Sequence, residues 1–229
     1  MTTHTLSEDE LRELYRKRAP RYDLTSHVYG LLGYRLDAYR RRGIELLALH
    51  SGDTVVEIGC GTGANLAQLE RAVGPTGAII GVDLSPAMLD QARARVHREG
   101  WSNVTLVESE AARYRFPERI NAILSTYALT LAPSYDDVIR QGANALVPGG
   151  RFVVVDFKAP RSWPEPVLRA IAPLFHPFGV TLGLRTRHPW ASLAKYLNLV
   201  VMEERCLGTT YIAAGERPAT PTGNGEARR

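Results

Sequence analysis

The chain has 229 residues, 45% of them hydrophobic and 23% charged, which suits one α/β domain with a substantial core. No run approaches the roughly 18 apolar residues of a membrane span. The polar start MTTHTLSEDE is unlike a signal peptide, and two cysteines are too few for a disulfide framework. We therefore expect a cytoplasmic protein with reduced thiols.

The net charge of +4 is distributed unevenly. Residues 11–42 carry nine Lys or Arg against three acids, and residues 158–190 carry five against one. Residues 43–157 between them carry nine against thirteen. The two basic segments fit either a solvated surface or attraction to an anionic partner, such as the inner face of a membrane. We expect no nucleic-acid partner, because no aromatic residues interleave with the basic ones.

The first fifty residues predict helices. Ser7 and Glu10 form a capping box for a short helix that Pro20 ends. Residues 24–49 predict one or two further helices. Apolar residues at helical spacing are expected to face inward, namely Leu11, Leu14 and Tyr15 in the first helix and Leu31, Leu32, Leu36, Ile44 and Leu47 later.

From Asp53 onwards, apolar strands alternate with helices, and a glycine turn follows the first strand. Ser85 is expected to cap the helix after the second strand. Strands this apolar, separated so regularly by helices, predict a mostly parallel sheet covered on both faces. The predicted strands are 54–59, 78–83, 103–108, 120–126 and 151–157, and the predicted helices end near 71 and 99 or span about 134–146.

The alternation of strands and helices stops at residues 160–190, which contain six prolines and many apolar residues. We interpret this segment as an inserted lid, because linkers are seldom so hydrophobic. A helix over 190–198 follows. The runs VVMEERC and TTYIAAG, joined at Leu207-Gly208, predict an antiparallel hairpin that closes the sheet. The α/β domain then covers residues 51–215, and residues 216–229 predict a disordered tail.

The first glycine turn carries the motif Glu57-Ile-Gly59-Cys-Gly61-Thr-Gly63. Glycines let the backbone turn sharply and let a ligand approach the main chain. The spacing also satisfies a loose dinucleotide fingerprint. A carboxylate at Glu57 favours a cationic ligand, since it would oppose a pyrophosphate. The alternative is a tight strand–helix turn with no ligand.

Asp83 ends the second predicted strand, where a carboxylate can accept hydrogen bonds from both hydroxyls of a ribose. Its alternative role is that of an acid near a helix N-terminus. Met88 can pack on an adenine or serve as an ordinary core methionine.

Successive motifs then resemble those of class I methyltransferases, which use S-adenosylmethionine. They are EIGCGTG, GVDLSPAML, SEAARYRFPE, LSTYALT and ALVPGGRFVVVDF, within residues 15–157. The resemblance implies a Rossmann-like, seven-stranded sheet. Two departures concern the adenine contacts: Glu110 replaces the commoner aspartate, and Asn121 stands where one usually begins the fourth strand. The implied cofactor-binding residues are Glu57, Gly59, Gly61, Gly63, Asp83, Leu84, Met88, Glu110, Ala111, Ser125 and Thr126, with Tyr127 beside the methyl group as the catalytic candidate.

Methyl transfer from a sulfonium is an in-line displacement with a good leaving group, so the enzyme mainly aligns the reactants and excludes water. A base is not always required, and we expect no metal ion. Candidate bases are Tyr127, Asp156, His27 and His176, each with a structural role as the alternative.

The acceptor is predicted from a second resemblance. The segment from Tyr15 to Tyr22-Asp23, followed by LTSHVYGLLG, resembles the N-terminal region of bacterial phospholipid and betaine-lipid N-methyltransferases. It implies that residues 1–50 form a helical lid, with Tyr15 and Tyr22 over the methionine part of the cofactor. Our first hypothesis is N-methylation of an amine on a membrane lipid headgroup, with peripheral membrane contact.

Other functions stay open. The layout also resembles quinone-biosynthesis methyltransferases, which C-methylate prenylated precursors, although LSTYALT lacks their glycine- and asparagine-containing stretch. A soluble small-molecule acceptor is a further alternative. An arsenite methyltransferase would need a third thiolate. A non-catalytic binding protein and an NAD-dependent reductase are the hypotheses from other classes, and the oligomeric state is left undetermined.

Overall fold

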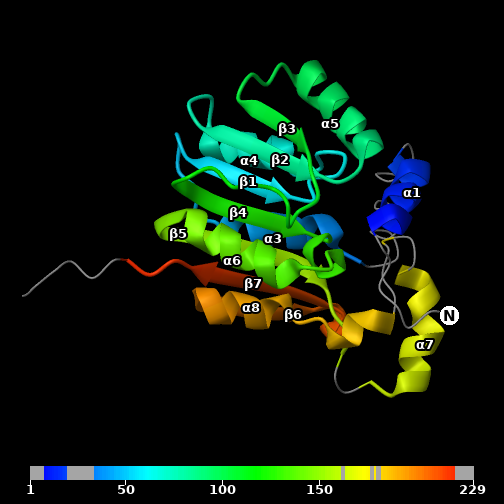
Figure 1. Ribbon diagram of the computed structural model, residues 1–229. Helices are drawn as coiled ribbons and strands as arrows, with labels where there is room; N and C mark the ends of the chain where they lie inside the picture. The colour runs from blue at the N-terminus through cyan, green and yellow to red at the C-terminus, as the bar shows by residue number, and fades with distance from the viewer. Residues whose placement is uncertain (1–7, 20–33, 161–162, 176–177, 179–181, 220–229) are drawn as a thin grey trace, which may run out of the picture.

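The computed structural model describes residues 8–19, 34–160, 163–175, 178 and 182–219 (Figure 1). In this part of the chain seven strands form one sheet, in the order β3-β2-β1-β4-β5-β7-β6. The strands are β1 (Thr54–Ile58), β2 (Ala78–Asp83), β3 (Val104–Glu108), β4 (Ile120–Thr126), β5 (Leu146–Phe157), β6 (Asn198–Arg205) and β7 (Thr210–Glu216).

The sheet is mostly parallel, and its last two strands form an antiparallel hairpin. β1 to β5 pair in parallel, whereas β7 runs antiparallel to β5 and β6 runs antiparallel to β7. The hairpin turns at Cys206–Gly208, as predicted. The predicted Rossmann-like, seven-stranded architecture is therefore confirmed.

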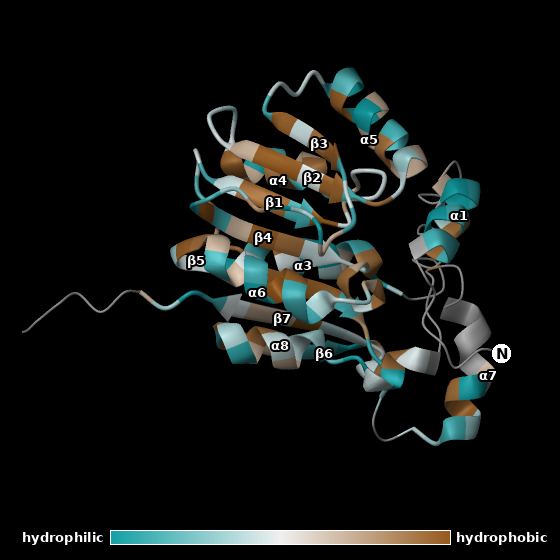
Figure 2. Cartoon of the chain, in the orientation of Figure 1, coloured by the Kyte–Doolittle hydropathy of each residue, from teal (hydrophilic) through white to brown (hydrophobic). Residues whose placement is uncertain are grey.

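Helices cover both faces of the sheet, and runs of hydrophobic residues lie along its central strands (Figure 2). Alternate residues of β5 point to opposite faces. Val153 and Val155 join the core under α3 and α4, whereas Phe152 and Val154 join the core under α6 and α8. The helices are α1 (Glu8–Arg18), α3 (Leu36–Leu46), α4 (Leu66–Val73), α5 (Pro86–Glu99), α6 (Tyr135–Ala145), α7 (Glu165–Phe175) and α8 (Pro189–Tyr196).

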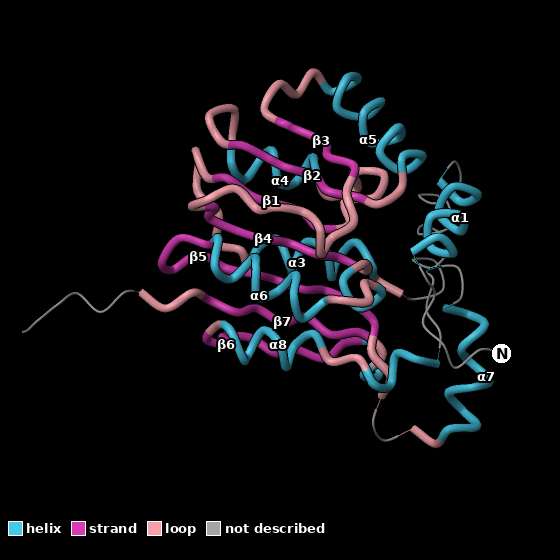
Figure 3. The backbone as a smooth tube through the Cα atoms, in the orientation of Figure 1, coloured by secondary structure: helices cyan, strands magenta, loops and turns pink. Residues whose placement is uncertain are grey.

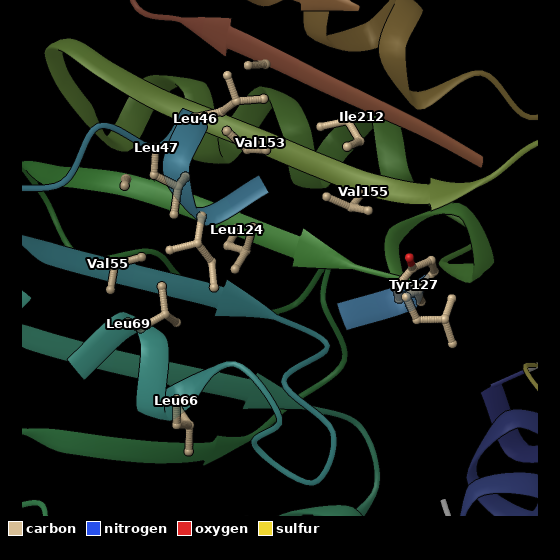
Figure 4. Packing of buried hydrophobic residues seen from close by; sticks show 14 of the residues in the cluster. Leu46, Leu47, Val55, Leu66, Leu69, Leu124, Tyr127, Val153, Val155 and Ile212 are labelled. Atoms are coloured by element: carbon tan, nitrogen blue, oxygen red, sulfur yellow. The ribbon is translucent and has the colours of Figure 1, made fainter. Parts of the chain in front are cut away.

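Helix α3 belongs to the core, although it falls within the predicted lid of residues 1–50. Leu36 and Ile44 are buried at helical spacing, and Leu47 follows the helix into the same cluster. A Cβ on Gly43 would lie 2.6 Å from the Val155 side chain, so the helix crosses β5 at close range. Figure 4 shows this cluster running along the strands to Tyr127. The lid interpretation therefore cannot extend to α3.

Three boundaries differ from the prediction. β5 begins at Leu146 instead of 151, and the Gly149-Gly150 pair lies within an irregular stretch of the strand. β6 begins at Asn198, two residues early. The third boundary is the start of the predicted tail at residue 216, because the backbone of Arg217 still exchanges hydrogen bonds with residues 149 and 150, at 2.9 Å each. The rest of the predicted tail, residues 220–229, lies outside the described residues.

Two helices from the segments predicted as lids, α1 and α7, lie at one end of the strands. Figure 3 shows α1 and α7 at the same side of the sheet, and the arrows of Figure 1 show that the parallel strands run toward that side. Residues 160–190 contain α7 and a short 3-10 helix, Leu182–Thr186. Within the described residues, no helix has the length and apolar character needed to cross a membrane.

Candidate active site

A cleft opens at the carboxyl ends of the parallel strands, where sheets of this type bind their ligands. The loops after β1 to β4 line it, together with residues of α1 and α3. The structure therefore brings together most of the predicted site. The predicted residues that line this cleft are Tyr15, Gly59, Gly61, Asp83, Leu84, Met88, Glu110, Ala111, Thr126 and Tyr127.

The glycine loop after β1 needs its glycines for different reasons. Gly59, Gly61 and Gly63 all have positive φ angles, of 73°, 56° and 76°. A Cβ on Gly63 would meet Leu66 at 2.6 Å, so this glycine serves helix packing and does not line the cleft. A Cβ on Gly61 would meet no atom within 4 Å. Gly61 therefore leaves open space on the cleft side, as a ligand approaching the backbone requires.

Asp83 links the end of β2 to the glycine loop. Its carboxylate accepts hydrogen bonds from the backbone N–H groups of Gly61, at 2.8 Å, and Ser85, at 2.9 Å. Burial raises the pKa of Asp83, while these N–H donors lower it. Ser85 also caps α5 as predicted, because its Oγ accepts a 3.4 Å hydrogen bond from the N–H of Met88. The same carboxylate faces the cleft, where a diol could reach it.

Glu57 lies just behind the cleft wall and is 1% exposed. Asn65 holds it in place: its Nδ2 donates to Glu57 Oε1 at 2.6 Å and to Thr126 Oγ1 at 3.0 Å. Burial raises the pKa of Glu57 to about 8, although Asn65 and the charge of Arg40 oppose the rise. Glu57 Oε2 has no hydrogen-bond partner among the described residues. An unpaired buried oxygen of this kind suits a cationic group.

Tyr127 follows β4 and lines the cleft with a buried side chain. Its φ of 56° is unusual for a bulky residue. Burial raises the pKa of Tyr127 well above its ordinary value, so the phenol stays protonated at neutral pH. Its hydroxyl has no hydrogen-bond partner among the described residues. The side chain can therefore donate a hydrogen bond, but it is poorly suited to act as a base.

Glu110 lines the cleft at the end of β3, together with Ala111. Both of its carboxylate oxygens already accept backbone hydrogen bonds, from Ala112 and Arg113, at 3.0 Å each. The Glu110 side chain thus stabilises the turn formed by residues 110–113. An interaction with an adenine amino group would have to use the remaining lone pairs of these oxygens.

The loop after Tyr127 forms an apolar wall at another part of the cleft. Asp156 holds this loop, since its carboxylate accepts hydrogen bonds from the N–H groups of Thr130 and Phe157, at 2.8 Å each. Burial raises the pKa of Asp156 to about 6. With both oxygens engaged, Asp156 is better placed to support the loop than to take a proton. The wall consists of Ala128, Leu129, Leu131, Ala132 and Pro133.

Helix α1 contributes Leu11 and Tyr15 to the cleft. The Tyr15 hydroxyl donates a 3.3 Å hydrogen bond to the carbonyl oxygen of Phe178, in the segment predicted as the second lid. Phe178 packs on Phe157, with ring centres 5.4 Å apart, and Phe157 packs on Tyr127 at 4.9 Å. The two predicted lid segments therefore contact each other beside the cleft.

The described residues place some of the other predicted side chains away from the cleft and leave others undescribed. Ser125 is fully buried within β4, and its Oγ has no partner among the described residues. Tyr22, His27 and His176 lie outside the described residues. Within the described part of the chain, no group of three or more His, Cys, Asp or Glu side chains is arranged to hold a metal ion.

Four polar residues that line the cleft were not predicted as site residues, namely Arg40, Thr62, Asn65 and Ser109. Arg40 of α3 lines the cleft, although it was assigned to a basic segment, and its position between Leu36 and Ile44 in the apolar stripe is a signal that could have identified it. Asn65, which binds Glu57, also lines the cleft. Its side-chain contact with β4 could not be read from its place in the loop.

The comparisons with known proteins agree with this geometry. Residues 55–150 match a family model described as a methyltransferase domain. Demethylmenaquinone methyltransferase of Tropheryma whipplei (strain Twist) is 34% identical over 174 residues, which cover 74% of this chain and 68% of that protein. The chain belongs to the class I S-adenosylmethionine-dependent methyltransferases. S-adenosylmethionine is the cofactor of that family.

The chain is also similar to a second curated protein and, in fold, to a solved structure. Ubiquinone/menaquinone biosynthesis C-methyltransferase UbiE of Pseudomonas aeruginosa (strain LESB58) is 32% identical over 155 residues, 67% of this chain. The match spans about 60% of that relative's length. A putative methyltransferase of Haloferax volcanii, solved with its activator Trm112, has a TM-score of 0.71 at 18% identity and covers 93% of this chain and 99% of that one. This last likeness concerns the fold alone.

The residues of the cleft fit the family's cofactor. Gly61 leaves room beside its backbone and Asp83 presents a carboxylate to a diol, while Glu57, just behind the wall, keeps an unpaired buried oxygen that suits a cationic group. S-adenosylmethionine carries a ribose, an ammonium and a sulfonium, so each of these features has a counterpart on the ligand.

Proposed function

We propose that the protein transfers a methyl group from S-adenosylmethionine to a ring carbon of a hydroxylated aromatic acceptor, in the class of quinone-precursor C-methylation. The observation that carries this proposal is the 34% identity with demethylmenaquinone methyltransferase over 174 residues. The UbiE relatives are also C-methyltransferases by name. The apolar wall Ala128–Pro133 supports it, because a flat aromatic ring with a prenyl tail needs a nonpolar surface.

The side chains of the cleft divide between two tasks. We propose that Gly61, Asp83, Leu84 and Met88 hold the adenosine part of the cofactor, with Glu110 and Ala111 near the adenine. When bound, S-adenosylmethionine supplies a methyl group on a sulfonium leaving group. The apolar loop would then place the acceptor ring, and α1 would keep water away from it.

Tyr127 is proposed to position the acceptor through its hydroxyl. The acceptor hydroxyl would lose its proton to solvent before binding, which makes the neighbouring ring carbon nucleophilic. That carbon would take the methyl group as the bond from methyl to sulfur breaks and S-adenosylhomocysteine leaves. The ring proton would then pass to the acceptor oxygen, which restores the aromatic ring and the hydroxyl. The neutral Tyr127 phenol can donate a hydrogen bond to the negatively charged acceptor oxygen. This role replaces the base predicted from the sequence.

The first hypothesis, lipid N-methylation, has weaker support. Much of the positive charge in residues 11–42 is paired within the protein. Arg12 pairs with Glu108 at 3.5 Å, and Arg42 pairs with Glu203 at 2.9 Å. Arg16 and Lys17 both pair with Glu13, at 2.7 and 3.0 Å. Less charge is therefore left to face an anionic bilayer than the sequence suggested.

The test is to incubate the purified full chain with methyl-labelled S-adenosylmethionine and one acceptor at a time. The acceptors are reduced demethylmenaquinone in detergent and vesicles of phosphatidylethanolamine with anionic lipid. We expect label in the quinol ring and none in lipid. Label in the phosphatidylethanolamine headgroup would instead establish N-methylation. Absence of label from both, with S-adenosylhomocysteine still bound, would reject quinol methylation in favour of another acceptor.

A further inference from the structure

Arg187 is a buried cation near the end of the inserted segment, residues 160–190. Its side chain is only 9% exposed, and burial lowers its pKa. Arginine is seldom so buried unless it is paired, because transferring its charge out of water is costly. The contacts of this side chain therefore indicate what it does for the protein.

The guanidinium of Arg187 binds the loop that forms the apolar wall. Its Nη2 donates a hydrogen bond to the carbonyl oxygen of Ala132, which lines the cleft. The guanidinium carbon lies 4.8 Å from the centre of the ring of Tyr135, the first residue of the helix that follows the wall. The backbone N–H of His188 donates to the Tyr135 hydroxyl at 3.3 Å. The inserted segment is therefore attached both to the wall and to α6.

Asp156 holds the same wall through the opposite charge. Its carboxylate is 1% exposed and accepts a 2.8 Å hydrogen bond from the N–H of Thr130, two residues before Ala132. Burial raises the pKa of Asp156, and the charge of Arg187 is among the influences that oppose this rise. Residues 130–132 are thus held between two buried, interacting charges, one bound to a backbone donor and the other to a backbone acceptor.

The cofactor half of the cleft is built from other residues, in the loops after β1 and β2. Arg187 is not among the described residues that line the cleft, so it can act on a ligand only through the wall. Its loss should therefore affect the two halves of the cleft unequally.

We propose that Arg187 is a positioning residue for the methyl acceptor, which fixes the apolar wall by joining the inserted segment to residues 130–132. The inference rests on the proposed function, in which the wall places the acceptor ring. The guanidinium is needed for the shape of the acceptor site and not for the cofactor site.

The test uses the full chain with two variants and a matched control. Arg187→Met keeps an apolar stem without the charge, whereas Arg187→Lys keeps the charge without the planar fork. Arg187→Lys also keeps the test available if Arg187→Met does not fold. The control is Arg185→Met, because the Arg185 side chain is 47% exposed and pairs with Glu165 at 3.8 Å.

The first measurement is backbone hydrogen exchange, followed by mass spectrometry, which needs no acceptor. In Arg187→Met we expect residues 129–132 to exchange at least about tenfold faster than in the wild type. Exchange of residues 59–63 and the affinity for S-adenosylhomocysteine should change less than about twofold. Arg187→Lys should show a smaller change in the same direction, and Arg185→Met should match the wild type.

Two results of the exchange experiment would overturn the proposal. Unchanged exchange of residues 129–132 would mean that Arg187 does not hold the wall. Equal acceleration in both loops would mean that Arg187 supports the whole fold.

The second measurement is the initial rate of methyl transfer to reduced demethylmenaquinone. We expect Arg187→Met to raise the KM for this acceptor about tenfold and to change kcat less than about twofold, because the wall binds the acceptor before and during the transfer. Arg187→Lys should recover part of the loss. A lowered kcat with an unchanged KM would overturn the proposal.

The two proposals fail separately. A wild type that transfers no methyl group to the quinol would refute the proposed function. The exchange of residues 129–132 decides the role of Arg187 in either case.

Discussion

The backbone of Gly59 and the methyl group of Ala128 lie against each other, so that a Cβ on Gly59 would stand 2.1 Å from the Cβ of Ala128. The contact joins the loop after β1 to the loop after β4. The first loop contributes to the proposed cofactor site, and the second begins the apolar wall. The absence of a side chain at Gly59 therefore sets how closely the two halves of the cleft approach.

Gly59→Ala should destabilise the fold by roughly 2–4 kcal/mol, because the new methyl overlaps Ala128 and the residue has a positive φ. Urea unfolding measures the loss. The double variant Gly59→Ala/Ala128→Gly should recover the part that is due to the overlap. Strict additivity of the two single changes would show that the contact is not the cause.

Gly61→Ala should weaken S-adenosylhomocysteine binding at least tenfold while costing only about 1 kcal/mol of stability. The added methyl meets no protein atom, but it occupies the open space of the cleft. Gly100→Ala is the matched control, because Gly100 also has a positive φ and open surroundings but caps α5 away from the cleft. Equal affinities in the two variants would argue against ligand approach at Gly61.

Glu57 should make the ligand-free protein less stable as the pH rises. Its pKa is raised by burial from 4.5 to about 8 in the folded state. Between these values the unfolded chain has released the proton and the folded chain still holds it, so unfolding releases a proton and stability falls with pH. The favourable contribution is complete below pH 4.5 and lost by about pH 8.

Glu57→Gln isolates this effect from the other titrating groups. Urea unfolding of wild type and variant at pH 5, 6, 7 and 8 should give a difference that grows in favour of the variant as the pH rises. A constant difference across this range would mean that the carboxyl is not held protonated. Asp156, with a pKa raised to about 6, should add a decline at lower pH in both proteins.

Cofactor binding should release a proton from Glu57, because an ammonium beside Oε2 favours the ionised carboxylate. At pH 7 we expect wild type to release up to about one proton more than Glu57→Gln. Calorimetry of S-adenosylhomocysteine binding in buffers with different ionisation enthalpies measures this number. Identical proton release in the two proteins would exclude Glu57 as the group that ionises.

Tyr127→Phe should lower kcat by about three- to tenfold, with little change in the affinity for S-adenosylhomocysteine. The variant keeps the buried ring and removes one neutral hydrogen-bond donor, worth about 1 kcal/mol. Stability should change little, because the hydroxyl has no partner among the described residues. Labelled methyl transfer to the acceptor measures kcat, and wild-type turnover would remove Tyr127 from the reaction.

The elements and their order could be predicted from the sequence because apolar runs of strand length alternate with helices. Asp83 and the glycine loop could be placed for the same reason, since each follows a strand directly. The start of β5 could not be predicted, because a Gly-Gly pair is typical of a turn. Gly149 and Gly150 belong to the strand only through the pairing of β5 with the strand beside it.

The charge state of the site was harder to anticipate than its position. Glu57 was expected to be ionised, yet burial raises its pKa to about 8. Arg40 was counted with its exposed neighbour Arg41, although the helix turns the two side chains to different environments. Both errors arise because burial depends on contacts that are distant in sequence.

The hydrogen bond from Tyr15 to the carbonyl of Phe178 bears on how this protein can be re-engineered. Chimaeras that exchange residues 160–190 for the corresponding segment of a relative are an obvious route to new acceptors. Such an exchange would place a different surface against α1, which contacts the original segment through Tyr15. Chimaeras that retain activity should therefore take both α1 and residues 160–190 from the same relative.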